Sequence, residues 1–269
     1  IMSYHNVPGA SMDFGAAATP MLYDILALQE LYGENWGYQS GDNVYSLSDN
    51  GIVKTYWDGG GLDRMDASSS NMAVNLNLNA GSISQIGNTY VAIAFKVTME
   101  QGAGSRFNDT ITGNDAVNTL WGDGGTDELR GGGGNDSIYG GVGIVDGADA
   151  ADQIFGDAGD DFLIGNGGDD TIFGGTGGAD LNDGHDEIYA GFGADDIYGN
   201  SGNDSLFGGG SLVAPNDQND EIFGGIGDDF LYGNGGADTL NGGPGNDYLH
   251  GGIDGDTYVM QAGGGRDII

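Results

Sequence analysis

An acidic residue recurs at a fixed distance from a run of glycines through the second half of the chain, as in GGGGNDSIYGG at residues 131–141. Carboxylate oxygens and the backbone carbonyl oxygens of tight turns are hard ligands of the kind that Ca²⁺ prefers. Glycine runs also occur in flexible linkers and in phosphate-binding loops, and the regularity of the pattern decides among these interpretations. Its nine-residue units begin at residues 104, 113, 122, 131, 140, 156, 165, 174, 190, 199, 208, 224, 233, 242 and 251.

The sixth position of this unit is aspartate in 14 of the 15 copies, and Asn118 is the exception. The eighth position is isoleucine or leucine in 14 copies, with Tyr258 in the last. A flexible linker has no reason to keep an acid and an aliphatic residue two positions apart, so the pattern predicts a folded repeat. The aspartates are Asp109, Asp127, Asp136, Asp152, Asp161, Asp170, Asp186, Asp195, Asp204, Asp220, Asp229, Asp238, Asp247 and Asp256.

The elements that position these residues follow from the unit itself. Glycines allow the positive φ angles of a tight turn, and the three residues after each aspartate are expected to form a short strand whose middle side chain points inward. Two units then make one coil, and stacked coils make a right-handed parallel β-roll. The unit G-G-x-G-x-D-x-U-x resembles the calcium-binding nonapeptide repeat of RTX proteins.

This resemblance implies a particular set of calcium ligands. In RTX rolls one turn supplies its aspartate and the carbonyls of its second and fourth positions, and the turn one coil later supplies its aspartate and the carbonyls of its first and third positions. The implied sets are Gly132, Gly134 and Asp136 facing Gly156, Ala158 and Asp161; Asn166, Gly168 and Asp170 facing Ala190, Phe192 and Asp195; and Gly225, Gly227 and Asp229 facing Gly242, Pro244 and Asp247. The same positions elsewhere add Asn200, Gly202, Asn234 and Gly236.

The composition agrees with an attached cation. The chain has 41 acidic residues against 6 lysines and arginines, a formal charge of −35, which opposes binding to nucleic acid and to anionic membranes. Two aspartates about 5 Å apart repel by roughly 3 kcal/mol at an effective dielectric constant of about 20. We therefore expect several calcium ions, and an unfolded roll without them.

Other features of composition exclude some classes of protein. No cysteine is present, so there is no disulfide scaffold, and no apolar run approaches the roughly 18 residues of a membrane span. No signal peptide opens the chain. The sequence begins and ends inside its own pattern, and we expect it to be a fragment.

Two departures from the plain repeat leave alternatives open. Seven extra residues stand between the fourth and fifth positions of three units, at 144–150, 178–184 and 212–218; they are either tolerated surface loops or hold extra ions through Asp146, Asp183 or Asp217. Aromatic residues at the ninth position form two rows, which either stack across the strands or make a binding ridge. The rows are Phe155, Phe173, Tyr198 and Phe223, and Tyr139, Ile164, Tyr189, Phe207 and Tyr232.

Residues 1–33 carry a helix signal and an active-site motif. The stretch ATPMLYDILALQELYG predicts a helix with Thr19 as N-cap, Pro20 at the first helical position and Gly33 at its end. The expected apolar face is Leu22, Ile25, Leu28 and Tyr32.

Upstream of that helix, IMSY resembles the Met-turn of serralysin-type zinc proteases, and the helix resembles the end of their catalytic domain. The resemblance implies that Met2 lies beneath a catalytic Zn²⁺, and that Tyr4 ligates it or hydrogen-bonds the tetrahedral intermediate. A structural tyrosine in a turn is the plain alternative. The motif H-E-x-x-H-x-x-G-x-x-H should then lie before residue 1.

Three segments in the middle, QSGDNVY, WDGGGLD and VTME, resemble in order the serralysin segments that build calcium sites where the protease joins the roll. The family has arginine in place of Gln39, which matters little if only the carbonyl binds. Acids of ordinary turns and strands are the alternative. The resemblance implies one site from Gln39, Gly41, Asn43, Asp58, Gly60 and Asp63, and a second from Gly61, Asp63, Thr98 and Glu100.

We therefore expect an all-β protein with one helix and four segments. Residues 1–33 are the end of a metalloprotease catalytic domain, 34–103 are β-sandwich-like strands, 104–259 are the calcium-binding RTX β-roll, and 260–269 begin an uncapped continuation.

Two functions fit this organisation. The first is the calcium-binding C-terminal region of a secreted, extracellular zinc metalloendopeptidase, which passes unfolded through a type I secretion apparatus and folds on external Ca²⁺. The second is a non-enzymatic RTX module of an adhesin or matrix protein. We expect a monomer, with protein substrates only for the parent protease. Because His5, His185 and His250 lack the spacing of a three-histidine zinc site, this segment alone is predicted to be inactive.

Overall fold

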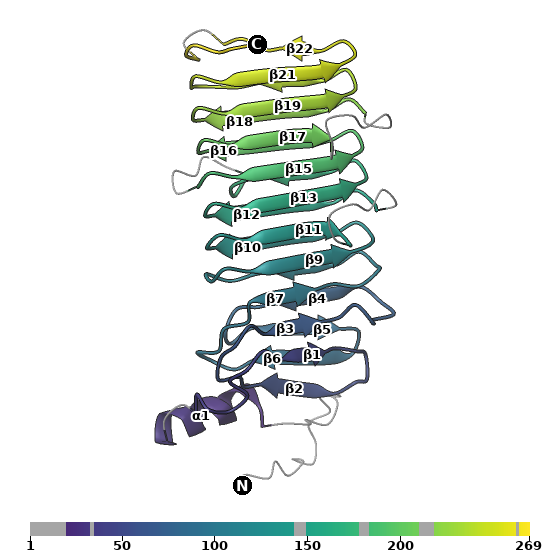
Figure 1. Cartoon of the computed structure of the whole chain (residues 1–269). Coiled ribbons are helices and arrows are strands. Elements are labelled where there is room, and N and C mark those ends of the chain that lie inside the picture. The colour runs from purple at the N-terminus through teal and green to yellow at the C-terminus, as the bar shows by residue number, and fades with distance from the viewer. Residues whose placement is uncertain (1–19, 33–34, 143–148, 178–182, 210–217, 262–263) are drawn as a thin grey trace.

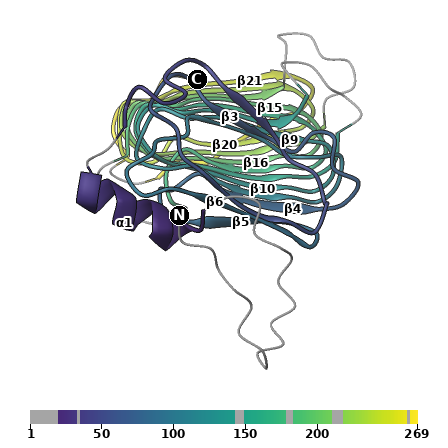
Figure 2. The same ribbon diagram turned by 90° about the horizontal axis from the view of Figure 1, so that it is seen from below.

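The computed structural model describes residues 20–32, 35–142, 149–177, 183–209, 218–261 and 264–269. The chain winds into an elongated stack of strands in two facing sheets, with one helix at the N-terminal end (Figure 1). Viewed along the stack, successive coils superimpose, so that the two sheets enclose one continuous core (Figure 2). This is the parallel β-roll that the repeat predicts.

The repeat units alternate between the two sheets. Each strand pairs in parallel with the strand two units later, so that Ile138 lies beside Leu163 and Ile154 beside Ile172. One sheet contains β8 (Thr110–Thr112), β10 (Glu128–Gly133), β12 (Gln153–Ala158), β14 (Thr171–Phe173), β16 (Asp196–Ser201), β18 (Glu221–Ile226), β20 (Thr239–Asn241) and β22 (Thr257–Tyr258). The other contains β9 (Thr119–Asp123), β11 (Ser137–Gly141), β13 (Phe162–Gly167), β15 (Glu187–Phe192), β17 (Ser205–Gly209), β19 (Phe230–Gly235) and β21 (Tyr248–Ile253).

The aliphatic residue at the eighth position of each unit forms the core of the roll. These side chains are at most 1% exposed, from Ile111 and Leu120 through Leu240 and Leu249, and they touch across the two sheets. Tyr258 closes the series and is only partly buried. Because each unit contributes one large apolar side chain, the core consists of two facing rows, one from each sheet, and this narrow core stabilises the roll less than a wide core would.

Residues 44–103 continue the same two sheets toward the N-terminus. Strands β1 (Val44–Ser46), β3 (Arg64–Asp66) and β7 (Gln101–Ala103) extend one sheet in parallel. The other sheet continues through β4 (Val74–Asn77), β5 (Ile83–Ile86), β6 (Thr89–Ile93) and β2 (Val53–Tyr56), in which β4, β5 and β6 pair antiparallel. The predicted sandwich-like strands are thus stacked on the roll as its first layers. They bury larger side chains, among them Met65, Leu76, Leu78, Ile86, Ile93 and Met99.

The helix α1 (Leu22–Tyr32) lies beside these first layers (Figure 1). It begins two residues later than predicted. The first carbonyl bonded by the helix is that of Met21, which accepts hydrogen bonds from the N–H groups of Asp24 and Ile25. Thr19 and Gly33 lie outside the described residues. Within the described residues, no helix has the length and apolar character needed to cross a bilayer.

The predicted apolar face of α1 was partly wrong. Leu22 and Ile25 are buried as expected, but Leu28 is 43% exposed and Tyr32 is 83% exposed. The third buried residue is Gln29, whose Nε2 donates a hydrogen bond to the carbonyl of Phe95 at 3.1 Å. A polar contact with the following sheet therefore sets the orientation of the helix, and a hydrophobic pattern does not reveal it.

The ninth-position aromatic residues stack across neighbouring strands. In the row on β12, β14, β16 and β18, the ring centroids lie 5.0, 4.8 and 5.0 Å apart with interplanar angles of 10° or less. At the start of this row, the guanidinium of Arg130 lies 3.8 Å from the centroid of Phe155. The ring faces are thus covered by one another, which favours stiffening of the roll over a ridge that offers open ring faces to a ligand.

Candidate metal centres

The sixth-position aspartates lie at the two edges of the roll, where each turn passes from one sheet to the other. From Asp109 to Asp247 each is at most 4% exposed. From Asp127 onward, its Oδ1 accepts a hydrogen bond from the backbone N–H of the sixth residue one coil earlier; Oδ1 of Asp109 accepts from the N–H of Val74 instead. The donor–acceptor distances are 2.7–3.2 Å. The two resulting ladders are Asp109, Asp127, Asp152, Asp170, Asp195, Asp220, Asp238 and Asp256, and Asn118, Asp136, Asp161, Asp186, Asp204, Asp229, Asp247 and Asp267.

The second oxygen of these carboxylates faces into the turn. A Cβ placed on Gly131 would lie 2.1 Å from Oδ2 of Asp136 and 2.6 Å from the carbonyl oxygen of Gly156 in the next coil. A carboxylate oxygen and a carbonyl oxygen therefore converge where the glycine has no side chain. Oδ2 is buried without a hydrogen-bond donor in Asp127, Asp136, Asp152, Asp161, Asp170, Asp186, Asp204, Asp229 and Asp247. Buried oxygens without a donor are costly, and a divalent cation would satisfy them.

Burial raises the pKa of these carboxyl groups. Desolvation is the largest cause, and repulsion from the next aspartate of the ladder adds to it, against the opposing effect of the backbone N–H. The pKa rises to about 8 in Asp127 and Asp170, and to about 7 in Asp229. A protein that keeps these groups buried near neutral pH must either protonate them or pair them with a cation.

The structure brings together the facing turns from which ligands were predicted. Asp136 lies next to Asp161, Asp170 next to Asp195, and Asp229 next to Asp247 along the ladders. The expected third-position carbonyls of Ala158, Phe192 and Pro244 each accept a hydrogen bond from the fourth-position N–H of the preceding coil, at 2.9–3.1 Å. A carbonyl has two lone pairs, so this bond leaves one for a metal.

The turn geometry explains the residue types at the second and fourth positions. Gly132 and Gly134 have φ angles of 109° and 104°. From the unit at residue 122 onward, a second position that is not glycine is an Asn or Asp with positive φ, such as Asn166 at 82° and Asn200 at 72°. Asn and Asp tolerate this left-handed region better than other side chains. Successive carbonyls can thus be directed to the same side of the corner.

Asn118 begins the second ladder in place of an aspartate. Its N–H donates to Oδ1 of Asp136 as the pattern requires, while its own Nδ2 donates to the carbonyls of Met99 and Glu100 at 3.3 Å. The amide of Asn118 is therefore bonded to residues 99 and 100, which precede the first repeat unit. On this edge there is no earlier repeat turn with which Asn118 could share an ion.

The two sites predicted in the N-terminal layers are mostly assembled. Asp63 accepts a hydrogen bond from the N–H of Asn43 at 2.9 Å and donates its own N–H to Glu100 at 2.9 Å. Asp58 accepts from the N–H of Gly60 at 2.8 Å and from the hydroxyl of Tyr45. Both aspartates are at most 1% exposed.

The remaining members of these two sites lie around Asp63. Asn43 donates its Nδ2 to the carbonyls of Gln39 and Gly41, and Gly61 packs against the backbone of Gly41. Desolvation, followed by repulsion from Asp58 and Glu100, raises the pKa of Asp63 to about 6, against the bond from Asn43. Thr98 is exposed, and no contact ties it to the cluster.

The donor set favours calcium over a transition metal. Within the described part of the chain, no group of three or more His, Cys, Asp or Glu side chains could hold a metal by itself. Each corner has two carboxylates, so its other ligands would be carbonyl oxygens, an all-oxygen set that suits Ca²⁺ and not Zn²⁺. Met2 and Tyr4, the predicted zinc-site residues, lie outside the described residues, as do Asp146 and Asp217.

Comparison with known proteins agrees with this geometry. The model of the RTX calcium-binding nonapeptide repeat matches residues 102–129, 112–144, 146–178, 180–211, 216–249 and 223–258, which together make up more than half of the chain. The chain belongs to the RTX calcium-binding nonapeptide repeat family. Its two ladders of buried aspartates are therefore formed mainly by the sixth positions of RTX repeats.

Several curated proteins are similar to part of this RTX chain. It is 35% identical to the metallopeptidase AprA of Pseudomonas marginalis, over 44% of this chain and 29% of that protein. It is 37% identical to serralysin of Proteus mirabilis, over 44% of this chain and 28% of that protein, and 41% identical to serralysin C of Dickeya chrysanthemi, over 41% and 27%. The match thus spans less than a third of each relative's length.

The structure reveals one further RTX turn that sequence counting missed. Asp267 accepts a hydrogen bond from the N–H of Asp247 at 3.2 Å, and Ile268 pairs with Tyr248 as a seventh-position residue does. Gly265 has a φ of 123° and stacks on the carbonyl of Gly245, as fourth-position glycines do. The sequence does contain the G-x-D spacing of the repeat, in GGGRDII. It was missed because two extra residues precede this turn, so that it does not fall nine residues after the previous unit.

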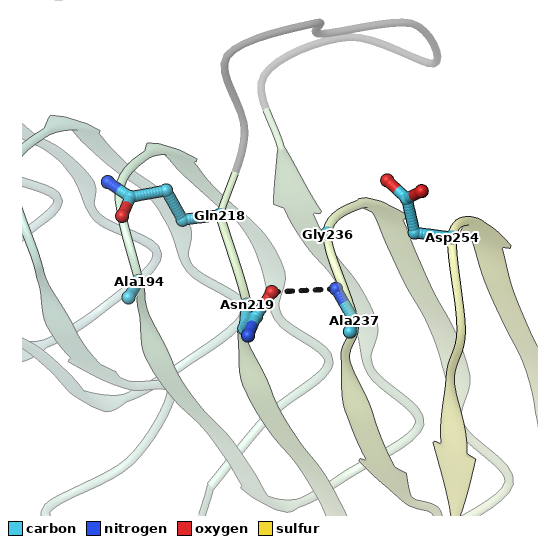
Figure 3. A pocket seen from close by; sticks show the side chains of 6 residues that line it. All are labelled: Ala194, Gln218, Asn219, Gly236, Ala237 and Asp254. Atoms are coloured by element: carbon cyan, nitrogen blue, oxygen red, sulfur yellow. Dashed lines mark hydrogen bonds between the residues drawn. The ribbon is translucent and has the colours of Figure 1, made fainter.

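Two other polar regions of the RTX chain lie outside the aspartate ladders. A surface hollow of about 540 Å³ lies over the turns of neighbouring coils, where Asn219 accepts a hydrogen bond from the N–H of Ala237 (Figure 3). Asp254 is the one ionisable side chain among its described lining residues, so the hollow has no catalytic pair. Its lining is Ala194, Gln218, Asn219, Gly236, Ala237 and Asp254.

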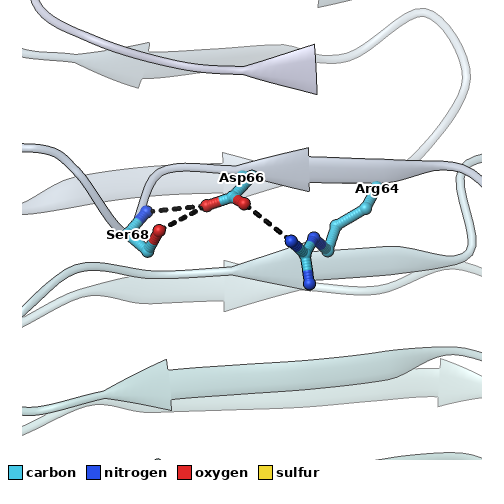
Figure 4. Close-up of polar contacts among 3 residues, drawn as sticks. All are labelled: Arg64, Asp66 and Ser68. Carbon is cyan, nitrogen blue, oxygen red and sulfur yellow. Dashed lines mark hydrogen bonds and ion pairs between the residues drawn. The ribbon is translucent and has the colours of Figure 1, made fainter. Parts of the chain in front are cut away.

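The other region is an ion pair in the first layers. Asp66 accepts hydrogen bonds from the N–H and hydroxyl of Ser68 at 3.1 and 2.6 Å, and it lies 2.8 Å from the guanidinium of Arg64 (Figure 4). Burial acts to raise the pKa of Asp66, but the bonds from Ser68 and Arg64 outweigh it and lower that pKa. This carboxylate is satisfied by the protein itself.

Proposed function

We propose that this chain is the calcium-binding C-terminal region of a secreted zinc metalloendopeptidase, in which the roll folds on extracellular Ca²⁺ after type I secretion. One observation carries the calcium part of the proposal: Oδ2 of nine buried aspartates is without a donor at the turn corners. The similarity to serralysins and the Met-turn sequence support the protease part.

Side chains and backbone of the roll would both supply calcium ligands. Sixth-position aspartates such as Asp136 and Asp161 would supply one carboxylate oxygen each, while the left-handed turn residues direct carbonyls toward the same corner. When bound, Ca²⁺ supplies the positive charge that offsets the repulsion along each ladder. Because facing ligands come from successive coils, each ion would join two coils, and binding and folding would be coupled.

This coupling provides a reason for the acidic composition in an exported chain. Where free Ca²⁺ is scarce, a formal charge of −35 keeps the chain extended and able to pass through a secretion channel. At extracellular Ca²⁺ concentrations, in the range of weak extracellular modules, the roll would close. The folded roll then stabilises the protease that precedes it. We infer a monomer whose partners are calcium ions, the secretion apparatus and protein substrates of the parent enzyme.

In the parent enzyme, Met2 would lie under the catalytic zinc and Tyr4 would ligate it or hydrogen-bond the tetrahedral intermediate. The zinc supplies an activated water and polarises the scissile carbonyl. The segment itself would be inactive, since the sequence contains no H-E-x-x-H.

The coding sequence upstream of Ile1 tests the protease part directly. We expect it to encode H-E-x-x-H-x-x-G-x-x-H, and the complete protein to cleave casein in a chelator-sensitive manner while residues 1–269 do not. An upstream region without this motif would instead favour a non-enzymatic RTX module. Caseinolysis by residues 1–269 alone would contradict the predicted inactivity.

A further inference from the structure

The seven-residue inserts place an aspartate at the same point of the turn. Asp149 in the first insert and Asp183 in the second both occupy the sixth insert position. The residues after them, Ala150 and Gly184, take over the fourth position of the turn. Gly168 packs on the carbonyl carbon of Ala150, and Gly202 on the carbonyl oxygen of Gly184, as fourth-position glycines of regular units pack on one another. Asp149, and not the predicted Asp146, is therefore the equivalent of Asp183.

Both insert carboxylates turn back onto their own unit. A Cβ on Gly141 would lie 2.0 Å from Oδ2 of Asp149, and a Cβ on Gly175 would lie 2.3 Å from Oδ2 of Asp183. Gly141 and Gly175 are the second residues of their units, whose carbonyls are ligands in the regular RTX set. The insert thus adds a carboxylate beside a carbonyl already positioned for an ion.

An independent observation on the next coil points to a ligand at the same place. Asn166 is 3% exposed, and neither its Nδ2 nor its Oδ1 has a hydrogen-bond partner. Its Nδ2 lies 3.4 Å from the position that a Cβ on Gly141 would occupy, and Oδ2 of Asp149 lies 2.0 Å from the same position. A buried amide without partners is costly, and rotating it by 180° would present its oxygen to the same space.

The sequence repeats this pairing with the inserts. Asn166, Asn200 and Asn234 stand at the second position of the unit that follows each insert on the same edge. Among the units that follow a unit without an insert on the same edge, most carry glycine there, as at Gly132 and Gly225, and none carries asparagine; Asp123 and Asp157 are the two that are not glycine. Asn234 is 6% exposed and reaches toward Gly209, the second residue of the third inserted unit, donating to its carbonyl at 3.2 Å.

The insert acid also adds charge to a crowded corner. After desolvation and the repulsion within the ladder, repulsion by Asp149 is among the causes that raise the pKa of Asp152 and Asp170 to about 8. Asp183 has the same effect on Asp186 and Asp204. A third carboxylate placed there for no ligand would destabilise the turn.

We propose that the first two inserts each build an accessory calcium site, with Asp149 and Asn166 as side-chain oxygen ligands at the first insert and Asp183 and Asn200 at the second. The site takes a hard divalent cation, because its donors are a carboxylate, an amide oxygen and backbone carbonyls. This proposal rests on the proposed calcium function of the roll and adds ions to those of the regular corners.

The test counts calcium ions bound per chain. Residues 1–269 and their variants are dialysed against buffered free Ca²⁺ over a concentration series, and bound calcium is measured by mass spectrometry while far-ultraviolet circular dichroism follows folding. We expect Asp149→Asn to lose one ion, or to bind it at least about tenfold more weakly, since charge count sets the affinity of such sites. The matched control is Asp169→Asn, an exposed acid on the same edge that removes the same charge.

Asn166→Gly provides a second variant that keeps the turn. Because regular units have glycine with positive φ at this position, the change removes the amide without straining the backbone. We expect Asn166→Gly to lose the same single ion as Asp149→Asn, with the calcium-dependent strand signal retained. The double variant should lose no second ion.

Each outcome separates this inference from the proposed function. If both variants bind as many ions as Asp169→Asn with midpoints within about twofold, the inserts are surface loops and the inference is wrong. If the unsubstituted chain itself binds no calcium, the proposed function fails before the inserts are in question.

Discussion

Two regions of this molecule treat a partly or fully buried aspartate in opposite ways. In the N-terminal layers, Asp66 is bonded by Ser68 and Arg64, and its pKa is lowered. In the roll, Oδ1 of Asp170 accepts a hydrogen bond from the N–H of Asp152, its Oδ2 has no donor, and its pKa is raised to about 8. The difference shows that a carboxylate whose oxygens are all bonded by protein donors needs no ion in the folded state. A ladder of carboxylates that each keep one buried oxygen without a donor needs a cation or protons from the solvent.

The two regions also differ in how much apolar surface they bury. Met65, Leu76 and Met99 pack with several others in the N-terminal layers, while the roll adds one aliphatic side chain per unit. The chain has only 6 lysines and arginines for 41 acidic residues, so it cannot give each aspartate of the roll an ion pair like that of Asp66 with Arg64. A dissolved divalent cation is the remaining counter-charge.

Removal of calcium should produce the largest difference between the two regions. We expect the roll to lose its strand signal in circular dichroism when free Ca²⁺ is reduced below micromolar with a chelator, because ladder repulsion is then uncompensated. Hydrogen exchange should show full loss of protection in residues 104–259 and smaller loss in the N-terminal layers. Equal protection in both regions after chelation would contradict the prediction that the roll depends on calcium more than the N-terminal layers do.

The pH dependence of the calcium-free roll should be the next largest effect. Eight of its corner carboxyl groups have pKa values of about 7 to 9 when folded, from about 7 in Asp229 to about 9 in Asp186, against an ordinary value near 3.8. The folded form therefore binds more protons, so the stability of the calcium-free roll is greatest at low pH and is lost as pH rises from about 4 through about 8. Protein stripped on a chelating resin should have more strand signal at pH 5 than at pH 9; the reverse order would contradict the raised pKa values.

A single corner substitution should have a local and smaller effect. Asp170→Asn removes one carboxylate from a corner while keeping its shape, and we expect the midpoint of calcium-induced folding to rise by about tenfold. Asp169→Asn is the matched control, since this neighbour is exposed and its change should leave the midpoint within about twofold. Indistinguishable midpoints for the two variants would mean that Asp170 holds no ion.

The smallest effect is expected in the region without an ion. Asp66→Asn should lower the stability of the N-terminal layers by about 1–2 kcal/mol, the usual cost of weakening a partly exposed charged hydrogen-bond pair. The calcium midpoint of the roll should not move. A shift in that midpoint, measured by circular dichroism titration, would show that Asp66 belongs to a metal site after all.

Much of the roll could be predicted from sequence because each unit is locally determined. A glycine turn, an aspartate and an inward aliphatic residue leave few alternatives, and Ile138 beside Leu163 follows from counting two units ahead. The burial of each aspartate and the facing pairs of turns follow from the same count. The ion ligands themselves stay predictions, because they depend on oxygens of two coils and on a cation.

The parts that could not be predicted depend on contacts between distant segments. The buried face of α1 is fixed by Gln29 reaching Phe95, a contact 66 residues apart that hydrophobic periodicity does not contain. Asp149 was passed over in the first insert, because its approach to Gly141 is a contact that only the fold shows. Asp146 lies outside the described residues. Asp267 was missed because a longer spacing hid a turn that the strand pairing restores.

Anomalous X-ray diffraction from crystals grown in millimolar Ca²⁺ would locate the ions. We expect calcium peaks at the turn corners between successive aspartates, such as Asp136 and Asp161, with Oδ2 of both as ligands. A well-ordered roll whose corners show no anomalous peak, with those oxygens bonded to water or protonated, would contradict this expectation.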